Sequence, residues 1–403
     1  MTLRNGGQDR RGSLRLGEPD GSSTVIMIGA NELANMVHQA AVDYGVRLDI
    51  IVPQSTRPYS AQMIGDSCKH SAHATLDRQR VLTFATDQIS SHQLRDLELS
   101  GDAMRPGLHA LNFSRDLLFL REALCSVGDL SIATPSFSAA MSATDIDIFA
   151  QQYGWPVVLK ARWTANEYRQ VQIVTSRQAA DRFLGCADRP STTEKTDKHR
   201  GYWIVEEYLE PTTEFIVLVA RRPSGYWVSY PPIEIGRQGG LHSETSMPAN
   251  LSSGVAEQAT QLAVSLLAGI DAVGIAAIKY FWTADARLLL DQIWLRPHGF
   301  GKLTLEGCQT SQFHQHLRAI LDWPLGTSTL ISPVATLELT CEPGNENFLS
   351  RVASVLKTPG VFLHLYPHQW QTSGHFGHIT ALGDTTDDAL SIVREAAKLF
   401  RDS

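Results

Sequence analysis

Short apolar runs and one amphipathic segment alternate over the first hundred residues. The runs at 24–28, 48–52 and 81–84 predict strands, and the apolar spacing over 33–44 predicts a helix. Gly29 stands between the first strand and the helix, where the chain must turn tightly. A strand, a turn, a helix and a strand in this order form a βαβ unit, so the pattern predicts a parallel sheet near the N-terminus.

The middle of the chain carries longer segments of both periodicities. The predicted helices are 111–125, 255–268 and 310–321, and the predicted strands are 153–163, 202–210, 215–220, 274–281 and 288–294. The last two strands flank the turn 283–286 and are expected to form a hairpin. A final β-rich segment runs from about 333 to 382, so the pattern indicates a mixed α/β protein.

Two polar residues interrupt the apolar pattern of the predicted hairpin. Strict alternation places residues 277, 279 and 281 on one face of the first strand, and residues 290, 292 and 294 on one face of the second. Lys279 and Gln292 are the polar exceptions. Polar groups at buried strand positions need partners, so these two indicate a cleft or a polar network. Alternatively, the hairpin lies at the sheet edge and both side chains reach water.

The composition is that of a globular chain and argues against nucleic acid as a partner. The 403 residues are expected to form about two to four domains. Hydrophobic residues make up 43% of the chain and charged residues 19%, which is not the composition of a disordered protein. The net charge of −7 provides no overall basic field for nucleic acid.

The cysteines and the longest apolar stretch predict a soluble cytoplasmic protein. The five cysteines are scattered without a CxxC pair, which is typical of a reducing compartment. The stretch 262–281 is interrupted by glycines and polar residues, so it is expected to form a buried helix and a strand and not a membrane span.

The sequence RPH at 296–298 lies just past a predicted strand end. The planar guanidinium of Arg296 suits a phosphate or a carboxylate, and His298 adds an imidazole. A buried structural arginine that binds backbone carbonyls is an equally good interpretation of Arg296.

Charged residues also gather at two other predicted strand ends. Lys160 ends one strand, and Glu206, Glu207 and Glu214 cluster around another. A lysine for phosphates together with carboxylates for a ribose or a metal ion would form a nucleotide site. Exposed charges at strand ends are common, so charged side chains that only face solvent are the alternative interpretation.

Two other kinds of site are not expected. His314 and His316 would point about 200° apart on a helix, so they cannot share a metal ion. His375 and His378 have no third ligand nearby, which argues against zinc. The segment after the first strand lacks the GxGxxG pattern of dinucleotide-binding proteins, so Gly29 is expected to serve only the turn.

Several segments resemble the family of N5-carboxyaminoimidazole ribonucleotide synthetases, which have the ATP-grasp fold. The most specific are RPH (296–298) and TSQFHQHLRAILDWPLG (310–326). NELANMVHQAAVDYG (31–45), PVVLK (156–160), VEEYLEPTTEF (205–215), VGIAAIKYF (273–281) and GHI (377–379) follow at matching intervals. The resemblance covers roughly residues 22–385.

The resemblance implies an α/β (α+β) fold, with an ATP-grasp domain preceded by a Rossmann-like parallel-sheet domain. The implied divisions are the N-terminal domain at 23–110, the ATP-grasp domain at 111–330 and a small β-rich domain at 331–403. The residues before them, 1–22, carry arginines among Gly, Asp and Ser and are expected to form a disordered tail. Within the ATP-grasp domain, a lid subdomain would span about 130–205 and a larger catalytic subdomain about 206–330. A homodimer is also implied.

By resemblance, the chain would use ATP and Mg²⁺ to convert bicarbonate to carboxyphosphate, which the amine of aminoimidazole ribonucleotide attacks. The implied ATP-binding residues are Lys160, Arg169, Glu206, Glu207, Leu209 and Glu214. Arg296 and His298 would be catalytic and contact the substrate, His375 would also contact the substrate, and Asp291 would remain as a metal ligand.

The chain departs from the family pattern at residues for both ATP and metal. The glycine-rich loop of the family reads TANEYRQV (164–171) here, which retains only Arg169. Lys279 and Gln292 occupy the positions of the two Mg²⁺-binding glutamates. A protonated lysine cannot bind Mg²⁺, and a glutamine offers only a neutral oxygen. Three interpretations follow: an impaired enzyme of purine biosynthesis, an inactive ATP-grasp scaffold that binds a nucleotide or a protein, and a ligase for another substrate.

Overall fold

The computed structural model describes residues 24–52, 80–126, 132–163, 171–186, 202–238, 241–340, 348–366 and 375–402. The predicted tail at 1–22 and Arg169 lie outside these residues. None of the described helices is long and apolar enough to cross a membrane.

A four-stranded parallel sheet begins the chain, as predicted. Its strands are β1 (Thr24–Ile28), β2 (Arg47–Ile51), β3 (Val81–Phe84) and β4 (Ala103–Met104), in the order β2-β1-β3-β4. Helix α1 (Glu32–Asp43) connects β1 and β2, and the side chain of Asn31 caps its N-terminus. Helix α3 (Ser91–Leu99) starts with a capping box of Ser90 and Gln93 and precedes β4.

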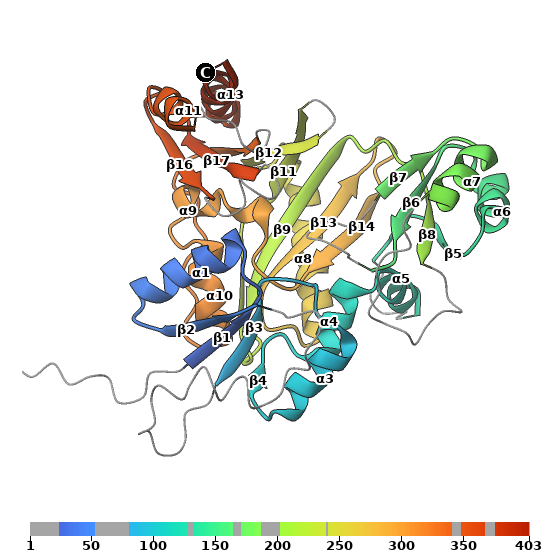
Figure 1. Ribbon diagram of the computed structural model, residues 1–403, viewed down its shortest axis with the longest axis horizontal. Coiled ribbons are helices and arrows are strands. Elements are labelled where there is room, and N and C mark those ends of the chain that lie inside the picture. The colour runs from blue at the N-terminus through green and yellow to red at the C-terminus, as the bar shows by residue number, and fades with distance from the viewer. Residues whose placement is uncertain are drawn as a thin grey trace, which may run out of the picture.

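A second sheet of nine strands runs through the centre of the molecule (Figure 1). Its strand order is β14-β13-β9-β11-β12-β15-β17-β16, and β10 pairs with β9. The strands are β9 (Thr213–Arg221), β10 (Trp227–Ser229), β11 (Ile233–Gln238), β12 (Leu241–Met247), β13 (Gly274–Trp282), β14 (Leu288–Trp294), β15 (Val334–Thr340), β16 (Val361–Leu365) and β17 (His375–Leu382). The C-terminal strands therefore extend the central sheet.

A third sheet forms a lobe at the right of Figure 1 together with helices α6 (Ala143–Tyr153) and α7 (Arg177–Cys186). Its strands are β5 (Phe137–Ala140), β6 (Val157–Ala161), β7 (Val171–Val174) and β8 (Trp203–Glu207), in the antiparallel order β5-β8-β6-β7. The lobe has its own hydrophobic core, which includes Ile146 and Phe149 of α6 and Val157 and Leu159 of β6.

The remaining helices cover the central sheet and join it to the N-terminal sheet. They are α8 (Ser253–Gly269), α9 (Thr304–Gly307), α10 (Gln312–Ile320), α11 (Phe348–Val355) and α13 (Thr386–Asp402). Phe313, Leu317 and Ile320 of α10 share a core with Leu33 and Val37 of α1. Helix α13 packs on β15 and β17 through buried residues such as Val393 and Phe400, and the sequence pattern had not predicted it.

The single helix predicted over 111–125 is wrong at its centre. Two helices, α4 (Leu108–Arg115) and α5 (Leu117–Ser126), meet at Asp116, whose backbone is extended. The Asp116 carboxylate accepts N–H bonds from Leu118 and Phe119, and it pairs with Arg162 at 2.6 Å. A short acidic side chain thus ends one helix and caps the next, which apolar periodicity alone does not reveal.

Candidate functional site

A β-bulge at Asp291 sets the geometry of the site. Lys279 of β13 lies opposite Gln292 of β14, but the next residue, Tyr280, lies opposite Leu290. Asp291 is therefore an extra residue in β14, and a bulge of this kind turns two successive side chains toward one face. The strict alternation predicted for residues 290, 292 and 294 is wrong, because Leu290 belongs to the hydrophobic core on the other face.

Lys279 lies between two carboxylates. Its Nζ is 3.0 Å from Glu214 Oε2 and 3.1 Å from Asp291 Oδ2, and all three side chains are buried or nearly so. The same ammonium stands 4.8 Å from the centre of the Phe281 ring. Burial lowers the pKa of Lys279, but Asp291 and Glu214 outweigh it and raise that pKa above its usual value, so the lysine stays charged.

A second lysine and an arginine complete the cluster. Lys160 Nζ is 2.6 Å from Glu206 Oε2 and 2.6 Å from Asp291 Oδ1. Arg121 is fully buried and donates from Nε and Nη2 to Glu206 Oε1 at 3.0 and 2.8 Å. Its Nη2 also lies 3.7 Å from Asp291 Oδ1, and Nη1 donates to the carbonyl of Leu290. The sequence reasoning missed Arg121, although an arginine within the apolar run LLFLREAL was a signal.

The resulting ion cluster balances three cations against three carboxylates. It comprises Arg121, Lys160 and Lys279 with Glu206, Glu214 and Asp291. Burial raises the pKa of Asp291, but Lys160, Lys279 and Arg121 together hold it well below its usual range. Lys160 and Glu206 come from the lobe sheet, whereas Glu214, Lys279 and Asp291 come from the central sheet, so the cluster joins the two.

The other predicted site residues lie on β8, β14 and β17 or just after β8. Glu207, at the end of β8, accepts the backbone N–H of Ser136 at 2.9 Å. Leu209 follows β8 and is partly buried, and Gln292 is partly exposed opposite Lys279. His375 opens β17, and its side chain lies outside the described part of the structure.

The cluster does not fit the Mg²⁺ ion that the resemblance implies. Both oxygens of Asp291 already contact ammonium groups, and Lys279 occupies the position between Asp291 and Glu214. Mg²⁺ requires oxygen ligands at about 2.0–2.1 Å in near-octahedral geometry. Within the described residues, no group of three histidine, cysteine, aspartate or glutamate side chains is arranged to hold a metal ion.

The loop 296–302 is tightly packed. Arg296 Nε donates to Asp87 Oδ2 at 2.9 Å, and its Nη1 donates to the carbonyl of Pro297. Only 3% of Arg296 is exposed. Arg296 is therefore a buried arginine that binds a backbone carbonyl, as one of the two interpretations expected. It also pairs with the carboxylate of Asp87, which follows β3 of the N-terminal sheet.

His298 is buried under two aromatic rings. Its ring centre lies 4.2 Å from that of Trp294 and 4.8 Å from that of Phe300. Burial, followed by the nearby Arg296 and Lys302, lowers the pKa of His298 well below its usual value. The side chain is therefore neutral at physiological pH, and its Nδ1 accepts the backbone N–H of Phe300.

Gly301 is needed for the packing of this loop, and replacing it with alanine should destabilise the protein by about 1–3 kcal/mol. An added Cβ would lie 2.6 Å from Nε2 of Gln312, which is fully buried. The Gln312 amide accepts the backbone N–H of His298 and donates to the His298 carbonyl, so it cannot easily move away. Urea unfolding would measure the loss. Gly299→Ala is the matched control, because its Cβ would meet only Lys302 at 3.7 Å; equal stability of the two variants would contradict the packing argument.

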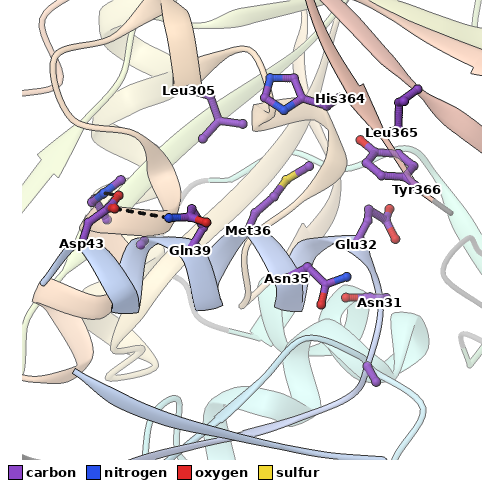
Figure 2. A pocket seen from close by; sticks show the side chains of 13 residues that line it. Asn31, Glu32, Asn35, Met36, Gln39, Asp43, Leu305, His364, Leu365 and Tyr366 are labelled. Atoms are coloured by element: carbon purple, nitrogen blue, oxygen red, sulfur yellow. Dashed lines mark hydrogen bonds and ion pairs between the residues drawn. The ribbon is translucent and has the colours of Figure 1, made fainter. Parts of the chain in front are cut away.

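A separate cavity of about 520 Å³ lies between α1 and β16. Figure 2 shows Glu32, Asn35, Met36 and Gln39 of α1 facing His364 and Tyr366 across it. Its charged lining residues are Glu32 and Asp43, and no lysine or arginine is among the described residues that line it. Lys302 stands nearby but pairs with Glu338 at 2.9 Å and Glu32 at 3.5 Å. This lining does not favour a phosphate group.

Comparison with known proteins gives consistent matches. A family model described as "ATP-grasp domain" matches residues 126–313. The chain is 30% identical to the N5-carboxyaminoimidazole ribonucleotide synthase of Mycobacterium tuberculosis, over 89% of this chain and 83% of that protein. It is 32% identical to the synthase of Mycobacterium leprae, over 90% of this chain and 84% of that protein.

Solved structures confirm the fold. An ADP complex of an N5-carboxyaminoimidazole ribonucleotide synthetase superposes with a TM-score of 0.78 at 22% identity, covering 95% of this chain and 98% of that chain. The Aspergillus clavatus synthase, in complex with ADP and 5-aminoimidazole ribonucleotide, gives a TM-score of 0.75 at 20% identity, covering 95% of this chain and all of that one. The predicted ATP-grasp architecture with a preceding parallel sheet is therefore correct.

Proposed function

Because the chain belongs to the family of N5-carboxyaminoimidazole ribonucleotide synthases, we propose that it carboxylates 5-aminoimidazole ribonucleotide in an ATP-dependent reaction of purine biosynthesis. The observation that carries this proposal is the similarity to these synthases over about nine-tenths of the chain. In this reaction bicarbonate attacks the γ-phosphorus of ATP and ADP leaves. The exocyclic amine then attacks the carboxyl carbon of carboxyphosphate and phosphate leaves.

We place the ATP phosphates near Lys160, at the junction of the lobe sheet and the central sheet. Glu206, Glu207 and Leu209 would lie around the adenine, and Glu214 would accept hydrogen bonds from the ribose hydroxyls. Lys160 is held by two carboxylates at 2.6 Å, so the phosphates must compete with Glu206 and Asp291 for its ammonium. Both carboxylates have other cationic partners, Arg121 and Lys279, which lowers the cost of that exchange.

We place the ribonucleotide near the loop 296–302. Arg296 would bind its phosphate, the neutral His298 would act on the amine, and His375 would also contact the substrate. The pairing of Arg296 with Asp87 would have to loosen for this contact.

We also propose a homodimer, which sedimentation analysis of the purified protein would test.

An inactive scaffold is the second candidate, and the ion cluster is the observation that favours it. Arg121, Lys160 and Lys279 are all paired with carboxylates, so none of these cations is available to a phosphoryl group without a rearrangement. Phosphoryl transfer depends on positive charge around the transferred group. A ligase for another amine or acid is a third candidate, since the fold alone does not specify the acceptor.

ATP hydrolysis by the purified protein separates these candidates. Bicarbonate and aminoimidazole ribonucleotide together should stimulate ADP release, and Lys160→Ala should lower the stimulated rate by about 100-fold or more, because a phosphate-binding cation is lost. Lys398→Ala removes an exposed lysine of α13 and should leave the rate unchanged. A folded protein without hydrolysis under any of these conditions would contradict the proposed activity and support the scaffold. Hydrolysis that only another amine stimulates would support the third candidate.

A further inference from the structure

Lys279 is a strand lysine whose ammonium lies between the carboxylates of Glu214 and Asp291. We infer that Lys279 is a built-in cation of the ion cluster: its ammonium replaces a divalent ion between Glu214 and Asp291 and excludes metal from that position. The inference goes beyond the proposed activity and does not depend on turnover, because metal binding can be measured without nucleotide or substrate.

The contacts of the two lysines leave no carboxylate of the cluster without a cation. Lys279 Nζ contacts Glu214 and Asp291 at 3.0 and 3.1 Å, and Lys160 Nζ contacts Glu206 and Asp291 at 2.6 Å each. The two ammonium groups therefore use different oxygens of Asp291, Oδ2 and Oδ1. Divalent ions would have to displace at least one lysine to bind directly to this carboxylate.

Charge balance argues in the same direction. The three carboxylates of the ion cluster are matched by three buried cations, so an added divalent ion would give the cluster a net charge of +2. In a buried site such excess charge is strongly unfavourable, because little water is present to screen it. Gln292, opposite Lys279 on the neighbouring strand, contributes a neutral amide and cannot balance the extra charge.

Removing the Lys279 ammonium reverses this balance. Lys279→Ala leaves three carboxylates against Arg121 and Lys160, together with a space beside Glu214 and Asp291. The cluster of this variant has a net charge of −1, and a bound divalent ion would change it to +1. The ion would also provide Glu214 and Asp291 with a cationic partner. The variant is therefore expected to gain a metal site that the natural protein lacks.

Binding of Mn²⁺ to the purified full-length protein, followed by electron paramagnetic resonance of the free ion, tests the inference. The natural protein should show no saturable Mn²⁺ site that depends on Asp291. Lys279→Ala should bind one Mn²⁺ per molecule, with a dissociation constant at least tenfold lower than any Mn²⁺ binding measured for the natural protein. Thermal unfolding of the variant should shift upward with Mn²⁺. If Lys279→Ala does not fold, Lys279→Gln, which keeps more of the side-chain volume, replaces it.

Two further variants control the result. Lys279→Arg retains the cation and should not gain the site, and Glu214→Gln added to Lys279→Ala should abolish it. Saturable Mn²⁺ binding by the natural protein that is lost in Asp291→Asn would overturn the inference. A folded Lys279→Ala or Lys279→Gln protein that binds no more Mn²⁺ than the natural protein would also overturn it.

Discussion

Replacing Asp291 with asparagine is expected to lower the free energy of unfolding by about 3–5 kcal/mol. Asp291 contacts Lys160, Lys279 and Arg121 together, at 2.6, 3.1 and 3.7 Å. The amide keeps the shape of the side chain but removes its charge. Three buried cations would then share two carboxylates, and removing one partner from a buried ion pair leaves a charge without compensation.

Urea unfolding at pH 7 of the natural protein and of Asp291→Asn measures this loss. Asp285→Asn is the control, because Asp285 pairs with Arg287 on the protein surface and its loss should have little effect. An Asp291→Asn protein as stable as the natural one, or more stable, would show that repulsion among the carboxylates outweighs their pairing with the cations. The description of the ion cluster as a stabilising unit would then be wrong.

Mild acid should destabilise the protein strongly. His298, His316 and His378 are each at most 4% exposed, and burial lowers the pKa of all three, that of His316 to about 3. The unfolded chain binds protons at these histidines below about pH 6.5, whereas the folded protein does not, so stability falls as the pH falls through this range. Each histidine contributes about 1.4 kcal/mol between pH 7.5 and 5.5, or about 4 kcal/mol together.

A single variant isolates one of these contributions. His316 Nδ1 accepts the backbone N–H of Ile275 and its Nε2 bonds Thr83 Oγ1 at 2.8 Å, so the ring is held in one neutral form. His316→Gln removes that titration, and the stability difference between pH 7.5 and 5.5 should shrink by about 1.4 kcal/mol. Gln39→Ala, at an exposed site of α1 without a titrating group, should leave the difference unchanged. A pH dependence that His316→Gln does not alter would contradict the assignment.

Much of the fold followed from the sequence because local patterns and core packing agree in it. The strands at 24–28 and 81–84 were predicted residue for residue, and the hairpin of β13 and β14 was predicted within one residue. Each of these segments has a regular apolar pattern and ends at a turn. The helix 310–321 was also correct, because Ser311 caps it and its apolar face is buried against α1.

The site was harder to predict because its geometry depends on contacts distant in sequence. The polar residue at position 279 did indicate a buried network, as expected. The extra residue at Asp291 shifts the alternation of β14, and no apolar pattern reveals which residue bulges. Arg121 lies 85 positions from its partner Glu206, so only the folded chain shows that the two form a pair.

The continuity of the central sheet has a consequence for the order of folding during synthesis. Strand β12 pairs with β15, which in turn pairs with β17. The edge of β12 therefore stays open until β15 has been made, and the edge of β15 stays open until β17, which ends at residue 382, has been made. An open strand edge can pair with another chain and lead to aggregation. The central sheet, which carries the ion cluster, is therefore complete only after the last fifth of the polypeptide has been made. Until then, its open strand edge exposes the nascent chain to misassembly.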